Sequence, residues 1–530
     1  MVSHLDRLLL TNIRRRQVLI GTGALTGLAI ASRWHKVVAQ PRFSAYPFSL
    51  GVASGDPLPN SVAIWTRLAP EPLSADGGML PQNVPVQWQV SDDEQMRRII
   101  RSGTVMATPE LGHSVRVEVQ GLRPAQWYWY QFRVGNEVST IGRTRTTPGK
   151  GDRLDELNFA FASCQNWEQG YFTAYKHMAQ EDLDVVFHLG DYIYEGNPTT
   201  RTDRPRKHAN PEPVDIGGYR IRYGQYKSDL DLQAAHAAFP FICTWDDHEV
   251  DNDYADEYSQ DFDDPKVFLQ RRAAAYQAYY EHMPLRQSSL PTGANMQLYR
   301  RFCFGDLAEF SVLDTRQYRT DQACPTSTRG GGRLVPVDQC PELFSRERTM
   351  LGKEQEKWLL AGLANSKTRW NVIAQQYLMA QLDEQPGEGQ GFWTDGWDGY
   401  LRDRDRILGF IHEQKIANPV VIGGDIHSFW VTDLKLDFND PKSPVVASEF
   451  VGTSISSSGV PFDTFSSYLP DNPHIKFFES RLRGYVRCSV ARELWTSDLK
   501  VVDTATTPDA PIRTLKTYIV ENGRPGPQQA

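Results

Sequence analysis

The sequence predicts an α/β domain with covered sheets that follows an all-β domain, and two patterns along the 530 residues support this. In residues 44–148, short stretches alternate apolar and polar side chains between Gly, Pro and Asp, as in antiparallel strands with one buried face. From residue 157 onward the apolar runs are unbroken and alternate with helical patterns, as in strands that are covered on both sides.

The all-β domain is predicted from alternating stretches at 61–66, 84–90, 114–119 and 127–132. Such spacing is typical of a β-sandwich of the immunoglobulin or fibronectin type, and the Gly-Leu-Arg-Pro turn at 121–124 resembles a fibronectin turn. Residues 147–151, with two glycines and a proline, are predicted to be the linker to the next domain.

The α/β domain is predicted to occupy residues 155–505. Its expected strands are 157–162, 185–189, 241–245, 371–374 and 420–423, and its expected helices are 171–183, 223–239 and 402–414. Residues 320–345 have the composition of a loop, and residues 506–530 are expected to be a C-terminal tail.

Residues 1–39 have the features of an export signal. Three arginines, Arg14 to Arg16, precede an apolar, Gly-rich run, and Val37-Val38-Ala39 provides a small residue for cleavage. The paired arginines resemble a twin-arginine signal, and the apolar run is too short to cross a bilayer. We expect the twin-arginine machinery to export the protein to the periplasm, the cell wall or the medium, with no membrane span after processing.

Charge and cysteine content narrow the function classes. A net charge of −8 argues against a stable nucleic-acid complex and leans toward a monomer. Six cysteines in this length do not make a disulfide scaffold. Cys324 and Cys340 flank a loop and are able to pair outside the cytoplasm, but the sequence leaves that pairing open.

Five apolar runs end in residues that suit metal binding. These ends are Cys164, Asp191 with Tyr194 three residues later, Asp246-Asp247-His248-Glu249, Gln375-Gln376, and Asp425-Ile426-His427. Ligands of open α/β sheets bind at the carboxyl ends of strands, so these side chains are expected to surround one site.

Taken alone, each strand end has a structural explanation. A Gly-Asp pair often forms a turn, a cysteine in an apolar run is usually core, and Asp247-His248-Glu249 fits the start of a helix. The ordered combination instead predicts a metal centre. Thiolate and phenolate ligands favour a highly charged ion such as ferric iron, whereas carboxylate and amide oxygens suit Ca²⁺ or Mg²⁺.

The same order of ligands resembles the calcineurin-like metallophosphatases, which include the purple acid phosphatases. Asp191 matches the bridging carboxylate of that superfamily, Tyr194 its phenolate ligand, His248 its catalytic histidine and His427 its last ligand. Asp247 stands where asparagine is usual.

Three departures point to a narrower group. Cys164 replaces an aspartate, Gln375 or Gln376 replaces a histidine, and Asp425 replaces another histidine. All three recur in the PhoD-like alkaline phosphatases and phosphodiesterases, which the chain also resembles at 48–57, 244–250, 313–319 and 397–400. The resemblance implies a metallophosphatase fold, with a two-sheet core flanked by helices. It also implies that this fold holds Fe³⁺ and neighbouring Ca²⁺, with two calcium ions expected.

The resemblance also implies an activity and a ligand set. The expected metal ligands are Cys164, Asp191, Tyr194, Asp247, Gln375, Asp425 and His427. The expected reaction is hydrolysis of small phosphate mono- or diesters by a metal-bound hydroxide, with release of inorganic phosphate. Asp191 would bridge the metals and His248 would stabilise charge or protonate the leaving oxygen.

The substrate pocket is less defined by the sequence. Asn166, Arg316 and Trp397 are candidates, although Arg316 also fits an internal ion pair and Trp397 fits loop packing. The alternative function is a phosphodiesterase or phospholipase that acts on cell-wall polymers, lipids or nucleic acids. A more remote alternative is a surface binding protein without catalytic activity.

Overall fold

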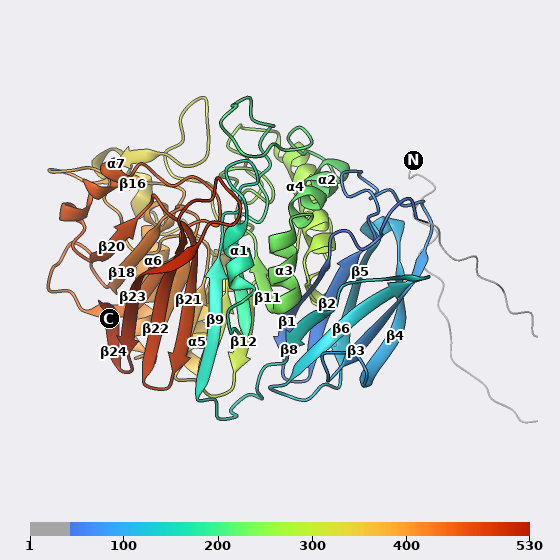
Figure 1. The fold of residues 1–530 in the computed structure, drawn as a ribbon. Coiled ribbons are helices and arrows are strands. Elements are labelled where there is room, and N and C mark those ends of the chain that lie inside the picture. Colours follow the sequence, from blue (N-terminus) through green and yellow to red (C-terminus); the bar gives the residue numbers. More distant parts are fainter. Residues whose placement is uncertain (1–42) are drawn as a thin grey trace, which may run out of the picture. The chain divides into compact units, whose positions relative to one another are not determined.

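The computed structural model describes residues 43–530, and the predicted signal, residues 1–39, lies outside the described residues. Two large mixed sheets form the core of this region (Figure 1). The first is ten-stranded, in the order β24 (Arg524–Gln529), β23 (Ile512–Glu521), β22 (Leu494–Val502), β21 (Arg483–Ala491), β9 (Glu156–Ala162), β10 (Val185–Leu189), β11 (Pro240–Thr244), β1 (Val52–Leu58), β2 (Ser61–Arg67) and β5 (Ser114–Gln120).

The second large sheet has seven strands. Their order is β12 (Arg300–Phe304), β13 (Ala308–Val312), β15 (Trp370–Ala374), β17 (Pro419–Gly423), β19 (Val445–Val451), β18 (Phe429–Lys435) and β20 (Ile475–Glu479). Strands β13, β15, β17 and β19 run parallel, as do β9, β10, β11 and β1 of the first sheet. The strands that end in predicted ligands therefore lie in two parallel groups.

The helices cover the outer faces of these two sheets. They are α1 (Thr173–Met178), α2 (Ile216–Lys227), α3 (Leu230–Ala238), α4 (Pro265–His282), α5 (Gly352–Asn365), α6 (Leu401–Glu413) and α7 (Phe462–Ser466). Helices α1 to α4 share a buried cluster with the ten-stranded sheet, and α5 and α6 share another with the seven-stranded sheet. None of the described helices combines the length and apolar character that a bilayer crossing needs.

A third buried cluster lies between the two sheets. Phe159 and Phe187 of the first sheet pack on Phe310 of the second, with the rings of Phe187 and Phe310 stacked at 4.5 Å between centroids. Strands buried on both faces explain the unbroken apolar runs in the sequence. The expected two-sheet core with helices outside is present.

The region 44–148 contributes strands to two sheets. β1, β2 and β5 extend the ten-stranded sheet, because β1 pairs in parallel with β11. A separate sheet contains β4 (Ile99–Ala107), β3 (Val84–Ser91), β6 (Trp127–Val134), β7 (Glu137–Val138) and β8 (Gly142–Arg145). Residues of both sheets form one buried cluster, so the alternating stretches do face each other across an apolar core.

Two expectations about local structure were wrong. The predicted helix 223–239 is two helices, because Asp229 caps the amino end of α3 through backbone amides of Asp231 and Leu232. The expected loop-like tail, 506–530, contains β23 and β24. β23 pairs with β22 on one side and on the other with β24, which is the edge strand of the ten-stranded sheet.

Lys227, the last residue of α2, is buried without an ion pair to any carboxylate of the described chain. Its Nζ lies 4.3 Å from the ring centroid of Trp65 on β2. Burial lowers the pKa of Lys227 to about 7, whereas the unfolded chain would have its ordinary value near 10.5. The unfolded state therefore binds the proton of Lys227 more tightly than the folded state, which lowers the free energy of unfolding. This destabilisation is complete below pH 7 and disappears as the pH rises toward 10.5.

Replacing Lys227 with Met should accordingly stabilise the protein at neutral pH. We expect the free energy of unfolding to rise by about 2 kcal/mol at pH 7, the protonation cost less the lost contact with Trp65. Chemical denaturation of both proteins from pH 7 to 10 would show the gain shrinking as pH rises. A constant difference across that range would contradict this account.

Candidate metal centre and its cavity

The loops after the parallel strands bring the predicted ligands together by unusual backbone conformations. Cys164, Asp191, Asp425 and His427 all have positive φ angles, between 53° and 61°. Non-glycine residues rarely adopt this conformation, and where they do the strain often marks a functional site. Gly190 is also left-handed, and a Cβ there would lie 2.6 Å from that of Asp246, which explains the Gly-Asp pair.

The first ligand group contains Cys164, Asp191 and His427, whose ligand atoms all lie within 4.8 Å of one another. Tyr194 joins them, because its hydroxyl donates to Asp191 at 2.7 Å and lies 2.9 Å from Nε2 of His427. Ser457 donates to the same hydroxyl at 2.8 Å. One thiol, one phenol, one imidazole and one carboxylate thus converge on one point.

Two further groups continue from the first, because the second shares one residue with the first and the third shares one residue with the second. Asp191 also stands with Asp247 and His248, and Asp247 stands with Asp246 and Asp425, at the same separation of ligand atoms. Because Asp191 and Asp247 each belong to two groups, the geometry fits adjacent ions with a bridging carboxylate. The donors are oxygen-rich on the Asp247 side and include sulfur on the Cys164 side, as the sequence predicted.

Electrostatics independently indicate that this site needs cations. Burial, followed by the charges of Asp246, Asp247 and Asp191, raises the pKa of Asp425 well above its usual range. Burial and Asp191 likewise raise the pKa of the Cys164 thiol. Oδ1 of Asp191 and Oδ2 of Asp246 are buried without a hydrogen-bond partner in residues 43–530. Bound metal ions would neutralise this charge and use the free oxygens, so the residues fit a metal centre.

His248 lies at the edge of this centre. Its Nδ1 is 2.7 Å from Oε2 of Glu195, and Oε1 of the same glutamate accepts the backbone amide of Asn252 at 3.0 Å. Although burial lowers the pKa of His248, Glu195, Asp247 and Asp191 together raise it well above its ordinary value. The pair with Glu195 fixes the orientation of the ring.

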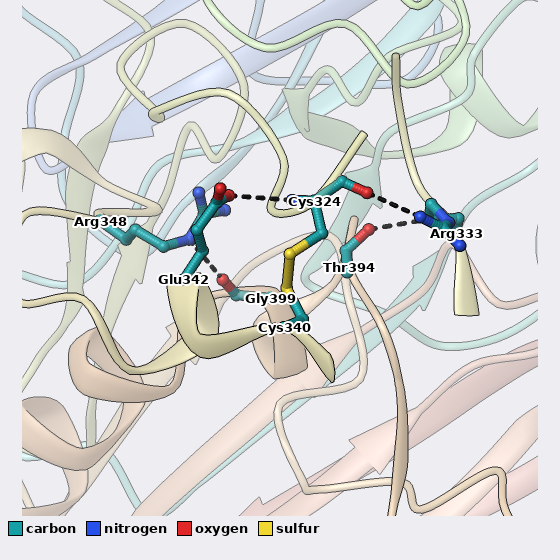
Figure 2. The surroundings of a disulfide bond; sticks show 7 residues. All are labelled: Cys324, Arg333, Cys340, Glu342, Arg348, Thr394 and Gly399. Atoms are coloured by element: carbon teal, nitrogen blue, oxygen red, sulfur yellow. Dashed lines mark hydrogen bonds between the residues drawn. A yellow bond between two sulfur atoms is a disulfide. The ribbon is translucent and has the colours of Figure 1, made fainter. Parts of the chain in front are cut away.

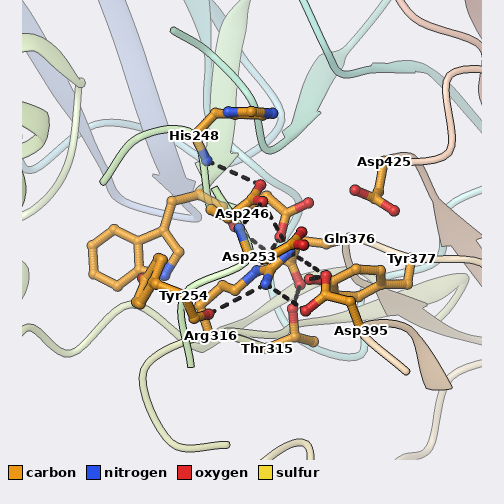
Figure 3. Close-up of polar contacts among 12 residues, drawn as sticks. Asp246, His248, Asp253, Tyr254, Thr315, Arg316, Gln376, Tyr377, Asp395 and Asp425 are labelled. Carbon is orange, nitrogen blue, oxygen red and sulfur yellow. Dashed lines mark hydrogen bonds and ion pairs between the residues drawn. The ribbon is translucent and has the colours of Figure 1, made fainter. Parts of the chain in front are cut away.

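Arg316 lies behind the centre instead of in the pocket. Its guanidinium is fully buried, donates to Asp246 at 2.7 Å and to Asp395 at 2.9 Å, and lies 3.4 Å from Asp247 (Figure 3). The internal ion pair, the alternative explanation of this residue, is the one that the structure shows. Arg316 therefore positions two carboxylates of the site.

The two glutamines have different surroundings. The side chain of Gln376 is hydrogen-bonded within the core: its oxygen accepts from the hydroxyl of Thr315 at 2.6 Å, and its nitrogen donates to the carbonyl of Trp245 at 2.8 Å. Gln375 accepts from the indole of Trp397 at 3.1 Å, and that indole belongs to a residue lining the cavity. Gln375 therefore lies next to the cavity, and within residues 43–530 neither glutamine side chain hydrogen-bonds to another predicted ligand.

The remaining pocket candidate, Asn166, holds the loop that follows Cys164. Its side-chain oxygen accepts the backbone amide of Glu168 at 2.9 Å, and its backbone N–H donates to the hydroxyl of Ser457 at 3.2 Å. It thus touches the serine that bonds Tyr194 and does not line the cavity next to the centre. Trp397, by contrast, does line that cavity.

Three positioning residues were missed from the sequence. Glu195 orients His248, and Glu249 accepts the backbone amides of Asp191, Tyr192 and Asp246, which ties together the loops after β10 and β11. Arg483 donates to the carbonyl oxygens of His427 at 3.0 Å and of Ser457. Glu249 was part of the Asp-His-Glu string, but no local pattern marks Arg483.

The centre forms the floor of a cavity of about 500 Å³. Asp191, Asp247, His248, Asp425 and His427 reach it from the floor, and apolar and aromatic side chains form much of its wall. None of the described residues that line it is an arginine or a lysine. An anionic substrate would therefore depend on bound metal ions for charge neutralisation.

The disulfide between Cys324 and Cys340, which the sequence left open, is present (Figure 2). The guanidinium of Arg333 donates to the carbonyl of Cys324 at 2.9 Å, and the carboxylate of Glu342 accepts the backbone amide of Cys324 at 3.0 Å. The bridged segment contains β14 (Leu334–Pro336), which pairs with β16 (Gly391–Trp393) at the mouth of the cavity. The disulfide thus anchors one wall of the site.

Comparison with known proteins assigns this arrangement to a family. The model of the PhoD-like phosphatase family matches residues 159–499, and that of the PhoD-like phosphatase N-terminal domain matches residues 32–148. The chain is 48% identical to alkaline phosphatase D of Bacillus subtilis (strain 168) over 524 residues, which covers 97% of this chain and 88% of that protein. A solved structure described as that of PhoD has a TM-score of 0.87 and 48% identity, covering 92% of this chain and 93% of that one.

The predicted family and enzyme class are thereby confirmed, and a phosphatase of this kind accounts for the clustered metal ligands beneath an open cavity. With the match of 159–499 and the identity over nearly the whole length, this chain belongs to the PhoD-like phosphatase family.

Proposed function

We propose that this enzyme hydrolyses small phosphate esters outside the cytoplasm, releasing inorganic phosphate and an alcohol from monoesters, or a phosphate monoester and an alcohol from diesters. The observation that carries the proposal is that Asp191 and Asp247 each belong to two adjacent ligand groups at the floor of the cavity. Adjacent metal sites of this kind are typical of phosphoryl-ester hydrolysis, because both the entering and the leaving oxygen develop charge.

The donor chemistry divides the proposed ions. Cys164, Asp191, Tyr194 and His427 would hold Fe³⁺, whereas Asp247, Gln375 and Asp425 would hold Ca²⁺, with two calcium ions expected. When bound, such ions supply Lewis acidity that offsets phosphoryl charge and makes water acidic enough to act as a nucleophile.

His248 is the proposed proton donor. Glu195 holds Nδ1, so Nε2 is the nitrogen that gives its proton to the leaving oxygen as the ester bond breaks. Arg316 and Glu249 act through the ligands that they position. The proposed reaction needs no covalent nucleophile, so Ser163, which is buried and precedes Cys164, is a core residue.

Diesters are the favoured substrates within this proposal. A diester carries one negative charge where a monoester dianion carries two, and the described lining offers seven carboxylates and no basic side chain apart from histidine. The second candidate function, a phosphodiesterase that acts on polymers or lipids, is supported by the same observation and by the size of the cavity.

The fold and location are proposed on related grounds. The two packed sheets with outer helices support a metallophosphatase fold for residues 155–505, and the facing strands of residues 44–148 support an immunoglobulin-like sandwich. The disulfide supports an oxidising location and hence the twin-arginine export inferred from residues 1–39. The monomeric state stays a prediction.

The test of the metal assignment is elemental analysis of the purified protein together with hydrolysis of 4-nitrophenyl and bis-4-nitrophenyl phosphate. We expect one iron per chain, faster diester hydrolysis, and loss of turnover when calcium is chelated. Zinc in place of iron would overturn the roles given to Cys164 and Tyr194. A metal-free, inactive protein would overturn the proposed function.

Replacing His248 with Asn tests the proton donor. We expect kcat to fall by about 10²–10⁴-fold on an alkyl phosphate, whose leaving oxygen needs a proton. The fall should be much smaller with 4-nitrophenolate, which leaves without one. Glu195→Gln, which keeps a hydrogen-bonding side chain of the same size, should show a weaker form of the same pattern. An equal loss on both substrates would indicate damage to the metal centre.

A further inference from the structure

Two large apolar side chains stand at the mouth of the cavity. Leu334 of β14 and Trp393 of β16 are direct partners in the antiparallel pair, and both line the cavity. Leu334 is 41% exposed and Trp393 is 42% exposed, although large apolar residues are usually buried. Neighbouring exposed side chains of this size form a surface that suits an apolar ligand.

This surface continues toward the metal centre. Leu382, Ile426, Val460 and Phe465 also line the cavity, and Ile426 lies between the predicted ligands Asp425 and His427. We call Leu334, Trp393, Leu382, Ile426, Val460 and Phe465 the apolar wall. A phosphoryl group on the floor would therefore have an apolar surface beside it.

The wall is held in place independently of any substrate. The disulfide Cys324–Cys340 brackets β14, and the amide of Arg333 donates to the hydroxyl of Thr394 at 3.0 Å beside β16 (Figure 2). A preformed surface loses little conformational entropy when a ligand binds. The strands that carry Leu334 and Trp393 are thus anchored by contacts that involve no substrate.

Charge disfavours the main alternative occupant, an anionic group. The described lining contains seven carboxylates and no arginine or lysine, and Arg329, an exposed side chain 3.7 Å from Asp253, does not itself line the cavity. A second phosphate or a carboxylate on the substrate would be repelled there. The structure favours a neutral, apolar group.

We propose that the apolar wall binds an aryl or alkyl group on one alcohol of the phosphate ester, so that Leu334 and Trp393 determine substrate selectivity. The inference rests on the proposed function, because the phosphoryl group must lie on the metal-binding floor. An alkyl chain and an aryl ring share the chemistry that the wall recognises, and they differ in shape.

The test is competitive inhibition of the metal-loaded enzyme by methyl-, butyl-, octyl- and phenylphosphonate, which carry a single substituent and are not hydrolysed. We expect the inhibition constant to fall roughly two- to fourfold for each methylene that becomes buried. In Leu334→Ser and Trp393→Ser the ratio of the methyl to the octyl constant should shrink at least tenfold. Trp393→Phe should restore most of it. Leu230→Ser, which changes an exposed leucine that does not line this cavity, should keep the wild-type ratio.

The outcomes separate the two levels of the argument. Octylphosphonate binding best would identify an alkyl substituent, and phenylphosphonate binding best would identify an aryl group. Equal constants for all four phosphonates in the wild type, or unchanged ratios in both serine variants, would overturn the proposal. No inhibition by any phosphonate, including methylphosphonate, would instead mean that the proposed metal centre does not bind phosphoryl groups.

Discussion

Replacing Asp191 with Asn is expected to lower kcat on bis-4-nitrophenyl phosphate by a factor of about 10³ or more. Asp191 belongs to two ligand groups, so the change weakens both neighbouring metal sites at once. An amide is a poor bridging ligand, because it carries no charge and presents only one oxygen.

The same variant should remain folded. Asparagine has nearly the size of aspartate, and its amide oxygen can accept the Tyr194 hydroxyl that Asp191 accepts at 2.7 Å. Circular dichroism and thermal unfolding would check the fold, and elemental analysis would check for a loss of bound metal. Asp405→Asn, at an exposed position of α6, is the matched control and should keep full activity. Near wild-type turnover in Asp191→Asn would contradict the assignment of Asp191 as a bridging metal ligand.

Removal of the metals is expected to lower the free energy of unfolding by about 4 kcal/mol relative to protein held at roughly 1,000 times the metal dissociation constant. Without cations, Asp246, Asp247, Asp191 and Asp425 repel one another in a buried site, and burial followed by this repulsion raises the pKa of Asp425. Thermal unfolding with and without a chelator would measure the difference.

Asp425→Asn separates this repulsion from a general loss of structure. In the metal-free protein the variant should be more stable than the wild type, because one buried charge has been removed. In the metal-loaded protein it should be less stable, because a ligand is missing. If Asp425→Asn were destabilising to the same extent in both states, the residue would be structural and not a ligand.

The sequence was sufficient for those parts of the site that sit at strand ends. Asp191, His248 and Asp425 each follow an unbroken apolar run, and parallel strands place such residues at one edge. The structure brings these side chains together as expected, with Tyr194 reaching Asp191 and His427 at once.

The residues that the sequence did not reveal act across long stretches of chain. Glu195 meets His248 from a loop that precedes it by 53 residues, and Arg483 bonds a carbonyl 56 residues earlier. No periodic pattern encodes such contacts, because they depend on how separate loops pack. For Arg316 the sequence left a pocket role and an internal ion pair open, and its burial among three aspartates makes it an internal counter-ion.

Local signals explain the remaining differences in the fold. The Ser228-Asp229 pair that ends α2 and caps α3 was a visible helix boundary, and the many β-branched residues of Ile512–Glu521 were a visible strand signal. The parallel pairing of β1 with β11, by contrast, joins residues 54 and 240 and had no local signal. Topology of this kind follows from the whole chain.

The strand order of the ten-stranded sheet also constrains when the protein can fold. β9 pairs with β10 on one side and with β21 on the other, so Phe161 is the register partner of both Phe187 and Val486. The middle of the sheet cannot be completed until nearly all of the chain has left the ribosome, and β1 must wait for β11. Pairings this distant in sequence form slowly. Folding is therefore expected to be post-translational, and a route that carries folded proteins would act on the molecule only after its last strands have been made.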